Sequence, residues 1–298
     1  MYSRILVPLD GSSLAEQVLP YARVLGKAFG AQVVLYGVFD PTFAETVADS
    51  QGRDPLSVKR RETRDYLTSI QSRLVDKGLK ATSSFHDDEP LPLTPADCIL
   101  DEAEKEPSTL IAMSTHGRAG IGRWLLGSTT AKVFQATRSP MLVVRPDDDG
   151  SPPQEGRLGS VLVPLDGSPL AEQVLPHATA VAKALDLEVT LLRVTPGLRP
   201  AEMAAPPPEP REPDPEAVAY LEPIEQRLRK AGVAAVKTRA EYAGSAASAI
   251  IDVAQELPNC LIALTSHGRS GIGRWYIGSV ADRVVRYARR AVLLTRAT

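Results

Sequence analysis

Short apolar runs alternate along this chain with longer segments in which apolar residues recur at helical spacing. The first run, residues 5–7, ends at Pro8, and Leu14, Val18 and Leu25 then return with the period of a helix. Pro20 lies inside that periodic segment, so we expect it to kink the helix or to cost it a hydrogen bond. Short apolar runs of this kind are typical of buried parallel strands, and the periodic segments are typical of helices that cover a sheet.

The same alternation predicts five strands in the first half of the chain. They are expected at residues 5–7, 32–39, 79–86, 109–114 and 141–145. Local start signals place helices after Asp54-Pro55, Thr94-Pro95 and Gly127-Ser128. Because strands and helices alternate throughout, the pattern favours right-handed crossovers and an α/β fold with a doubly wound parallel sheet, covered by helices on both faces.

The chain is a tandem repeat. Residues 5–38 align with residues 161–194 without a gap, and both segments contain LVPLDGS and LAEQVLP. A second block, residues 114–128, is identical to residues 265–279 at 10 of 15 positions. A period near 150 residues is too long for a solenoid unit, so it indicates two whole domains fused in one chain. The second set of strands is expected at residues 160–163, 188–194, 234–242, 260–265 and 291–295.

Composition places the joint between the two domains. Residues 146–156 are acidic and rich in proline and glycine, as linkers are. We therefore expect a first domain at 1–146, a linker at 147–157 and a second domain at 158–298. Eight prolines between Pro196 and Pro215 predict an extended surface loop inside the second domain.

Charge and cysteine content exclude several classes of protein. The chain has 34 Lys and Arg against 36 Asp and Glu, and it lacks the basic excess with which proteins bind nucleic acid. Cys98 and Cys260 form no disulfide framework or zinc pattern and are expected to be buried as small apolar residues. No apolar run reaches the length of a leader peptide or a membrane span, so we expect a cytoplasmic protein without a membrane partner.

Two loops are expected at the carboxyl ends of strands, where doubly wound sheets bind their ligands. Asp10-Gly11-Ser12 follows the first strand, and residues 114–128 follow the fourth. In the second loop nine residues separate Gly117 from Gly127, and Ser128 then begins a helix. Glycines at such positions let backbone N–H groups approach an anion, and the helix dipole favours phosphate there. The loop is neither a Walker A motif, because no Gly-Lys-Ser/Thr follows, nor a Rossmann fingerprint, because it follows the fourth strand.

On these residues both halves resemble the universal stress protein family, in its ATP-binding branch, over nearly the whole chain except the linker and the proline-rich loop. The family motif is Gly-x-x-Gly, nine residues, then Gly-Ser/Thr. The resemblance implies a Rossmann-like fold of the adenine nucleotide alpha hydrolase-like type and ATP as the ligand, with Mg²⁺ only as an escort of the triphosphate. It also implies that Asp10 and Asp166 recognise the adenine and that Val38 and Val194 lie near it.

The residues assigned to nucleotide binding in the first copy are Pro8, Asp10, Val38, Ser114, His116, Gly117, Arg118, Gly127, Ser128 and Thr129. Those in the second copy are Pro164, Asp166, Val194, Thr265, His267, Gly268, Arg269, Gly278, Ser279 and Val280.

The sequence departs from the family motif at its first glycine, which is Ser114 in one copy and Thr265 in the other. A side chain there would weaken binding if the position needs a positive φ or a close backbone contact. If the backbone is ordinary, the replacement simply adds a hydroxyl group. Two further pairs of residues also have alternative interpretations. His116 and His267 either contact phosphate or ribose or hold the loop, and Arg118 and Arg269 either neutralise phosphate or are solvated.

Other features argue against catalysis and metal binding. Trp124 and Trp275 lie in the segment between the loop and the helix, where an aromatic side chain more often packs against the fold than stacks on a ligand. The run His86-Asp87-Asp88-Glu89 has no counterpart in the second copy, so we interpret it as a solvated loop and expect no metal site. No catalytic constellation recurs in both halves.

We therefore predict a protein that is not an enzyme, or at most a slow ATPase, and that acts as an ATP-binding factor in the stress response. The alternatives are an interaction scaffold with degenerate sites and no ligand, and an enzyme that uses a nucleotide. The resemblance also implies pairing through the final strand of each domain. Residues 141–145 and 291–295 should thus form an intramolecular pseudo-dimer, and two chains could associate further as a homodimer.

Overall fold

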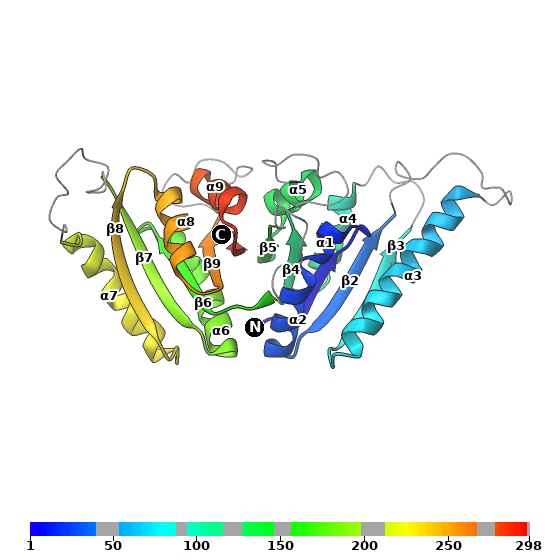
Figure 1. The fold of residues 1–298 in the computed structure, drawn as a ribbon, viewed down its shortest axis with the longest axis horizontal. Coiled ribbons are helices and arrows are strands. Elements are labelled where there is room, and N and C mark those ends of the chain that lie inside the picture. Colours follow the sequence, from blue (N-terminus) through cyan, green and yellow to red (C-terminus); the bar gives the residue numbers. More distant parts are fainter. Residues whose placement is uncertain are drawn as a thin grey trace. The chain divides into compact units, whose positions relative to one another are not determined.

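A computed structural model describes residues 1–39, 54–87, 94–115, 127–145, 156–197, 212–266 and 278–296. The chain divides into two compact units, Met1–Gly156 and Arg157–Thr298, which we call unit 1 and unit 2. Figure 1 shows that each unit is a sheet covered by helices.

Unit 1 contains one parallel sheet with the strand order β3-β2-β1-β4-β5. Its strands are β1 (Arg4–Pro8), β2 (Gln32–Val38), β3 (Ala81–His86), β4 (Thr109–Ser114) and β5 (Met141–Val144). Its helices are α1 (Ser13–Glu16), α2 (Leu19–Phe29), α3 (Pro55–Val75), α4 (Pro95–Glu104) and α5 (Ser128–Ala136). The chain builds outward from β1 to β3 and then returns to the other side of β1. With right-handed crossovers, α2 and α3 therefore cover one face and α4 and α5 the other.

Unit 2 repeats this arrangement with the order β8-β7-β6-β9-β10. Its strands are β6 (Ser160–Leu165), β7 (Glu188–Pro196), β8 (Val236–Ala243), β9 (Cys260–Thr265) and β10 (Ala291–Thr295). Its helices are the 3-10 helix η3 (Ala171–Val174), α6 (Leu175–Leu185), α7 (Pro215–Lys230), α8 (Ala246–Glu256) and α9 (Ser279–Tyr287). The predicted fold class, a doubly wound parallel sheet in each half of the chain, is confirmed.

The central strands form the core of each unit. All six residues of β4 and all six of β9 are buried, because helices cover both faces of the sheet. Cys98 and Cys260 are buried as free thiols, as the sequence indicated. Burial raises the pKa of the Cys260 thiol to about 11, so this group behaves as a small apolar side chain.

The prediction of a helix kinked at Pro20 is wrong. The periodic segment forms two helices instead, because α1 ends at Glu16 and α2 begins at Leu19. Pro20 lies in the first turn of α2, where its missing N–H would have had no partner in the helix. In unit 2 the 3-10 helix η3 runs directly into α6, and Pro176 likewise lies in the first turn of α6.

Other expectations lie partly or wholly outside what is described. Pro196 ends β7 and Pro215 begins α7, whereas residues 198–211 of the proline-rich segment fall outside the described residues. The pairing of the two final strands with each other stays a prediction. Within the described ranges, every helix is too short or too polar to cross a membrane.

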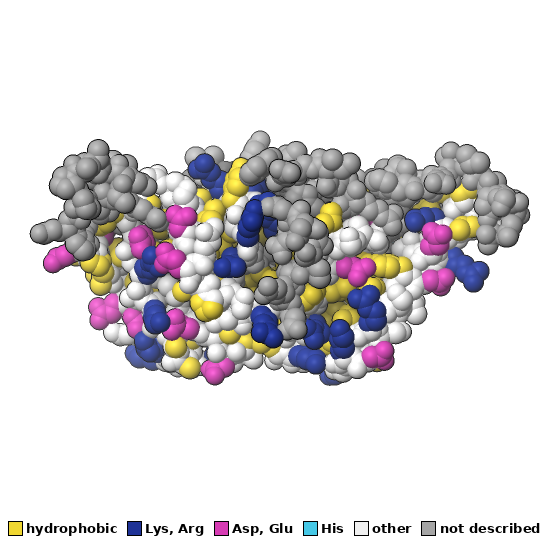
Figure 2. All heavy atoms as spheres, in the orientation of Figure 1, with side chains coloured by type: hydrophobic (Ala, Val, Ile, Leu, Met, Phe, Trp, Pro, Cys, Tyr) yellow, Lys and Arg dark blue, Asp and Glu magenta, His cyan; other side chains and the backbone are white. Residues whose placement is uncertain are grey.

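Charges of both signs are mixed on the face that Figure 2 shows. Some charged side chains of unit 2 are paired: Arg227 with Glu172 at 2.7 Å, and Lys237 with Glu188 at 3.0 Å. More than half of the Arg227 and Lys237 side-chain surface is exposed, and exposed ion pairs contribute little to stability. The contacts that matter most for the fold are therefore the buried ones.

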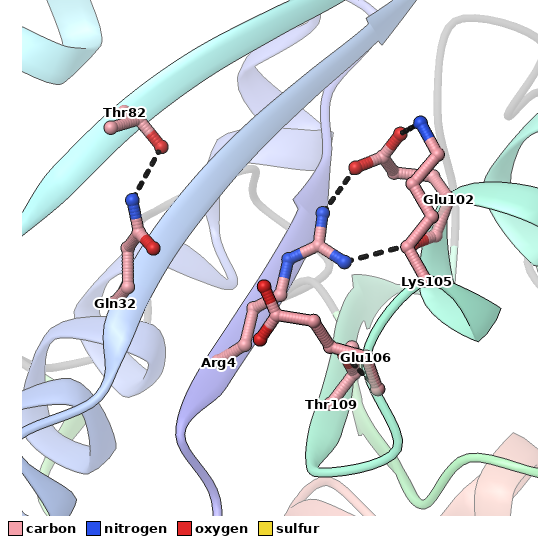
Figure 3. A network of polar contacts seen from close by, with 7 residues as sticks. All are labelled: Arg4, Gln32, Thr82, Glu102, Lys105, Glu106 and Thr109. Atoms are coloured by element: carbon pink, nitrogen blue, oxygen red, sulfur yellow. Dashed lines mark hydrogen bonds and ion pairs between the residues drawn. The ribbon is translucent and has the colours of Figure 1, made fainter.

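One buried ion pair joins the sheet of unit 1 to α4 (Figure 3). Arg4, the first residue of β1, donates through Nη1 to the backbone oxygen of Glu102 at 2.8 Å and through Nη2 to its carboxylate. Lys105 Nζ lies 2.6 Å from the other carboxylate oxygen. The Arg4 and Glu102 side chains are 6% and 9% exposed. Unit 2 has Ser160 and Val253 at the corresponding positions, so this pair belongs to unit 1 alone.

A buried hydroxyl in unit 2 gives a test of how polar groups affect the core. Thr190, in β7, is 4% exposed, and its Oγ1 has no hydrogen-bond partner within the described part of the chain. The corresponding residue of unit 1 is Val34, also buried. Thr190→Val should raise the free energy of unfolding by about 1 kcal/mol, because a desolvated, unsatisfied hydroxyl is removed. Urea unfolding followed by circular dichroism measures the change. Val34→Thr is the matched control and should lower stability by about 1–3 kcal/mol. A loss of stability in Thr190→Val would contradict the conclusion that the Thr190 hydroxyl is buried without a hydrogen-bond partner.

Candidate functional site

The candidate site of each unit lies at the carboxyl ends of two neighbouring strands. In unit 1 these are β1 and β4, which pair directly and lie where the order of the strands reverses. In unit 2 the corresponding strands are β6 and β9. Loops that follow two such strands diverge and leave a crevice, which is where doubly wound sheets bind ligands.

The loop after β1 orients a carboxylate. Asp10 Oδ1 accepts hydrogen bonds from the Ser12 amide at 2.9 Å and from the Ser12 hydroxyl at 2.6 Å. Gly11 between them has a φ of 84°, a conformation that side chains disfavour, so the sequence Asp-Gly-Ser suits this turn. Ser12 then caps α1, since its Oγ accepts from the Ala15 amide at 3.1 Å. The turn therefore couples the position of Asp10 to the start of α1.

Unit 2 repeats this geometry. Asp166 Oδ1 accepts from the Ser168 amide at 2.9 Å and from its hydroxyl at 2.6 Å, and Ser168 Oγ accepts from the Ala171 amide at 3.1 Å. The intervening Gly167 has a φ of 82°. The shared sequence thus folds in the same way in both copies.

The second element of the site is the amino end of α5, where Gly127 is the N-cap residue. Its φ of −53° and ψ of 142° are open to any residue, and its own N–H donates to the Thr115 carbonyl at 2.7 Å. The glycine therefore supplies neither a left-handed turn nor a free amide. What it supplies is an N-cap without a side chain, so that the first amides of α5 have no side-chain cap.

Gly278 has the same role at the amino end of α9. Its φ is −58°, its ψ is 142°, and its N–H donates to the Ser266 carbonyl at 2.8 Å. The first amides of α9 likewise have no side-chain cap. Both helices thus present N–H groups and a positive dipole end at the same edge of the sheet as the aspartate loop.

The backbone of Ser114 and Thr265 excludes one of the conditions raised above, a position that needs a positive φ. Both residues lie in strands and pair with the neighbouring strand, Ser114 with Val144 and Thr265 with Thr295. Neither has a positive φ. A side chain at this position therefore costs no backbone strain. In unit 2 the added hydroxyl also makes a contact, since Thr265 Oγ1 donates to the Ala171 carbonyl at 3.3 Å and so joins β9 to η3.

The remaining predicted residues fall into two groups. Several lie on the elements that form the site: Pro8 and Pro164 in β1 and β6, Val38 and Val194 in β2 and β7, Ser128 and Thr129 on α5, and Ser279 and Val280 on α9. Others lie outside the described residues, namely His116, Gly117, Arg118, Trp124, His267, Gly268, Arg269 and Trp275.

The acidic run after β3 is described only in part. Asp87 forms an ion pair with Arg64, whereas Asp88 and Glu89 lie outside the described residues. Among the residues with described positions there is no group of three or more His, Cys, Asp or Glu side chains that could hold a metal ion.

Sequence reasoning missed polar residues around the site of unit 2. Arg193 Nη1 donates to the Leu165 carbonyl at 3.3 Å, and its guanidinium carbon lies 5.7 Å from the centre of the Tyr220 ring. Thr195 Oγ1 donates to Asp214 at 2.7 Å, and this hydrogen bond lowers the pKa of the Asp214 carboxyl. One signal was available in the gapless alignment of the two repeats. Position 37 of the first copy is Gly37, whereas the aligned position of the second copy is Arg193, so a charged side chain is present in the second copy alone.

It also missed two tyrosines that contact the helix after each aspartate loop. Tyr66 contacts Glu16, and Tyr220 contacts Glu172. The available signal was the glutamate, which belongs to the LAEQVLP segment shared by both copies.

Comparison with known proteins gives the relationship of the whole chain. The sequence profile of the Universal stress protein family matches residues 1–145 and again residues 158–296. A universal stress protein from Mycolicibacterium smegmatis is 24% identical over 297 residues, covering 98% of this chain and 96% of its own length. Universal stress protein MJ0531 from Methanocaldococcus jannaschii is 30% identical over 146 residues, which are 49% of this chain and 83% of that protein.

A solved structure agrees in fold. The crystal structure of a universal stress protein from Archaeoglobus fulgidus superposes with a TM-score of 0.72 at 20% identity, and the match covers 100% of both chains. The family profile alone covers most of the sequence, once in each half. The chain described here therefore belongs to the universal stress protein family.

Proposed function

We propose that each unit binds one molecule of ATP at the carboxyl edge of its sheet, and that the chain acts as a nucleotide-responsive factor in the stress response. The observation that carries this proposal is the convergence of an oriented carboxylate and an uncapped helix start at one edge of the sheet. The convergence occurs in both units, with the same distances within the aspartate loop.

The two elements suit the two ends of an adenine nucleotide. The carboxylates of Asp10 and Asp166 can accept a hydrogen bond from the exocyclic amine of adenine. The first amides of α5 and α9, with the hydroxyls of Ser128 and Ser279, can donate to phosphate oxygens. Mg²⁺ would enter with the triphosphate as its counter-ion.

The proposed role is binding and not turnover. The two units share two binding elements. The aspartate turn suits the adenine amine, and the helix start stabilises a bound anion through N–H groups, which cannot act as a base toward a water at the phosphates. Slow hydrolysis of bound ATP would need little beyond a positioned water. Phosphate release over hours, set against the rate of nucleotide exchange, separates a binding protein from an ATPase.

Titration calorimetry on protein freed of bound nucleotide tests the proposal. We expect two ATP molecules per chain. GTP should bind more weakly, because guanine carries a carbonyl oxygen where adenine carries its exocyclic amine. Asp10→Ala and Asp166→Ala should each weaken one site by about tenfold or more, because a hydrogen bond to a charged group is lost.

Asp76→Ala, an exposed residue beyond the last turn of α3, is the matched control and should leave both sites unchanged. Unchanged ATP affinity in the double variant Asp10→Ala/Asp166→Ala would contradict the proposal. An absence of ATP binding by the unaltered protein would favour a scaffold without a ligand.

A further inference from the structure

The aspartate loop of unit 1 leads directly into α1, a helix of four residues. A single turn is not stable in isolation, so the position of α1 depends on contacts with the rest of the unit. Its last residue, Glu16, makes such contacts with α3. The Tyr66 hydroxyl donates to Glu16 Oε1 at 3.1 Å, and Arg73 Nη1 lies 3.7 Å from Oε2.

Unit 2 contains the same three residue types in the same arrangement. The Tyr220 hydroxyl donates to Glu172 Oε1 at 3.2 Å, and Arg227 Nη2 lies 2.7 Å from Oε2. The tyrosine and the arginine lie on α3 in unit 1 and on α7 in unit 2. In each of these helices the arginine follows the tyrosine by seven residues, which is two helical turns, so both side chains lie on one face of the helix.

We propose that Tyr66 and Tyr220 are positioning residues of the nucleotide sites. Each tyrosine holds the glutamate of the short helix and thereby orients the aspartate loop that precedes this helix in the chain. In unit 1 the contacts run from the Tyr66 hydroxyl to Glu16, through α1 to Ser12, and from Ser12 to Asp10. The inference rests on the proposed function, because it takes Asp10 and Asp166 to contact a nucleotide.

Both phenols keep the proton that this role requires. Burial, and then the neighbouring carboxylate, raise the pKa of Tyr66 and of Tyr220 well above the usual range for tyrosine. Each hydroxyl therefore remains a hydrogen-bond donor at any pH at which the protein would be assayed.

The two units should depend on their tyrosines to different degrees. Arg227 lies closer to Glu172 than Arg73 does to Glu16, at 2.7 Å against 3.7 Å. We therefore expect loss of the Tyr66 hydroxyl to matter more than loss of the Tyr220 hydroxyl.

The experiment uses the full chain in a Gly278→Asp background, in which a charged side chain at the N-cap of α9 should weaken ATP binding to unit 2 about a hundredfold, so that unit 1 is the site observed. Tyr66→Phe should weaken ATP binding about fivefold to tenfold, the effect of one hydrogen bond. The affinity of unit 1 for inorganic tripolyphosphate, corrected for the weaker binding of the ATP that it displaces, should be unchanged, because the phosphate end of the proposed site lies on α5 and not on α1. Tyr220→Phe, measured for unit 2 in a Gly127→Asp background, should weaken ATP binding by a smaller factor.

Two further variants separate positioning from general damage to the fold. Glu16→Gln keeps an oxygen that accepts from Tyr66 and should bind ATP like the unaltered site, whereas Glu16→Ala should resemble Tyr66→Phe. Ser69→Ala is the matched control on α3. It removes an exposed hydrogen bond, from Ser69 Oγ to the Tyr66 carbonyl at 2.7 Å, that does not reach α1.

Amide hydrogen exchange of residues 12–17 gives a readout that does not depend on the nucleotide. It should be faster in Tyr66→Phe than in Ser69→Ala. Unchanged exchange, unchanged ATP affinity, or an equal loss of ATP and tripolyphosphate binding would overturn the positioning role. If the unaltered chain binds no ATP, the proposed function fails, and exchange alone then decides whether Tyr66 holds the loop.

Discussion

Replacing Gly127 by aspartate should weaken ATP binding to unit 1 by about a hundredfold or more and leave the fold intact. Gly127 is the N-cap of α5, and its backbone angles are ones that aspartate adopts readily. An aspartate there accepts hydrogen bonds from the first amides of the helix, which would otherwise be open to phosphate. Its charge also repels the triphosphate. Loss of two charge-assisted hydrogen bonds is worth about 3 kcal/mol or more, which is the expected hundredfold.

This substitution distinguishes loss of binding from loss of folding, because a new N-cap should stabilise the helix. The free energy of unfolding should rise by roughly 0.3 kcal/mol relative to glycine, which is itself a tolerated N-cap residue. Calorimetric titration with ATP and urea unfolding measure the two effects. Gly127→Asn caps the same amides without adding a charge, so it separates the loss of open amides from the charge repulsion of the triphosphate. Gly127→Ala leaves the amides open and should retain most of the affinity.

The second repeat provides an internal control. Gly278→Asp should affect unit 2 alone, because Gly278 has the same N-cap geometry at α9. If the double variant Gly127→Asp/Gly278→Asp binds ATP as tightly as the unaltered chain, the helix starts are not the phosphate sites.

Replacing Glu102 by valine should lower the free energy of unfolding of unit 1 by about 3–5 kcal/mol. The substitution leaves the buried Arg4 guanidinium without a carboxylate partner, and an uncompensated buried charge is costly. The cost is large relative to the whole stability of a domain, so a marked fall in the urea midpoint is expected.

Unit 2 indicates which second substitution should restore stability. It has Ser160 and Val253 where unit 1 has Arg4 and Glu102, and Val253 is completely buried. Arg4→Ser/Glu102→Val should therefore recover most of the loss, since neither charge is then buried. Glu104→Val, an exposed position on α4, is the control and should change stability by about 0.5 kcal/mol or less. A single Glu102→Val variant as stable as the unaltered chain would show that the pair is not held in a dry interior.

The alternation of short apolar runs with periodic segments was enough to predict the fold of each unit. Strand and helix periods are local properties of the backbone, and a buried parallel strand requires a continuous apolar run such as residues 109–114. Helix starts were equally accessible. The side chain of Asp54 accepts from the Leu56 and Ser57 amides and Pro55 begins α3, as the dipeptide indicated. These signals act over a few residues and need no knowledge of the sheet.

The break between α1 and α2 was not accessible in the same way. A proline fits the first turn of a helix and disrupts its interior, so the effect of Pro20 depends on where the helix begins. That point is set by the contacts that hold α1, among them the one between Glu16 and Tyr66, 50 residues apart.

By itself, the sequence determined that two copies of one α/β unit follow each other, and that each places an aspartate and a glycine-serine pair after predicted strands. Only the tertiary structure decided that Ser114 and Thr265 have ordinary strand backbones and that Gly127 acts as an uncapped helix start. It also decided that Arg4 meets Glu102 across 98 residues. The physical reason is the range of the interactions. Periodicity and capping are set by neighbours along the chain, whereas these contacts exist only once the order and register of the strands have brought distant residues together.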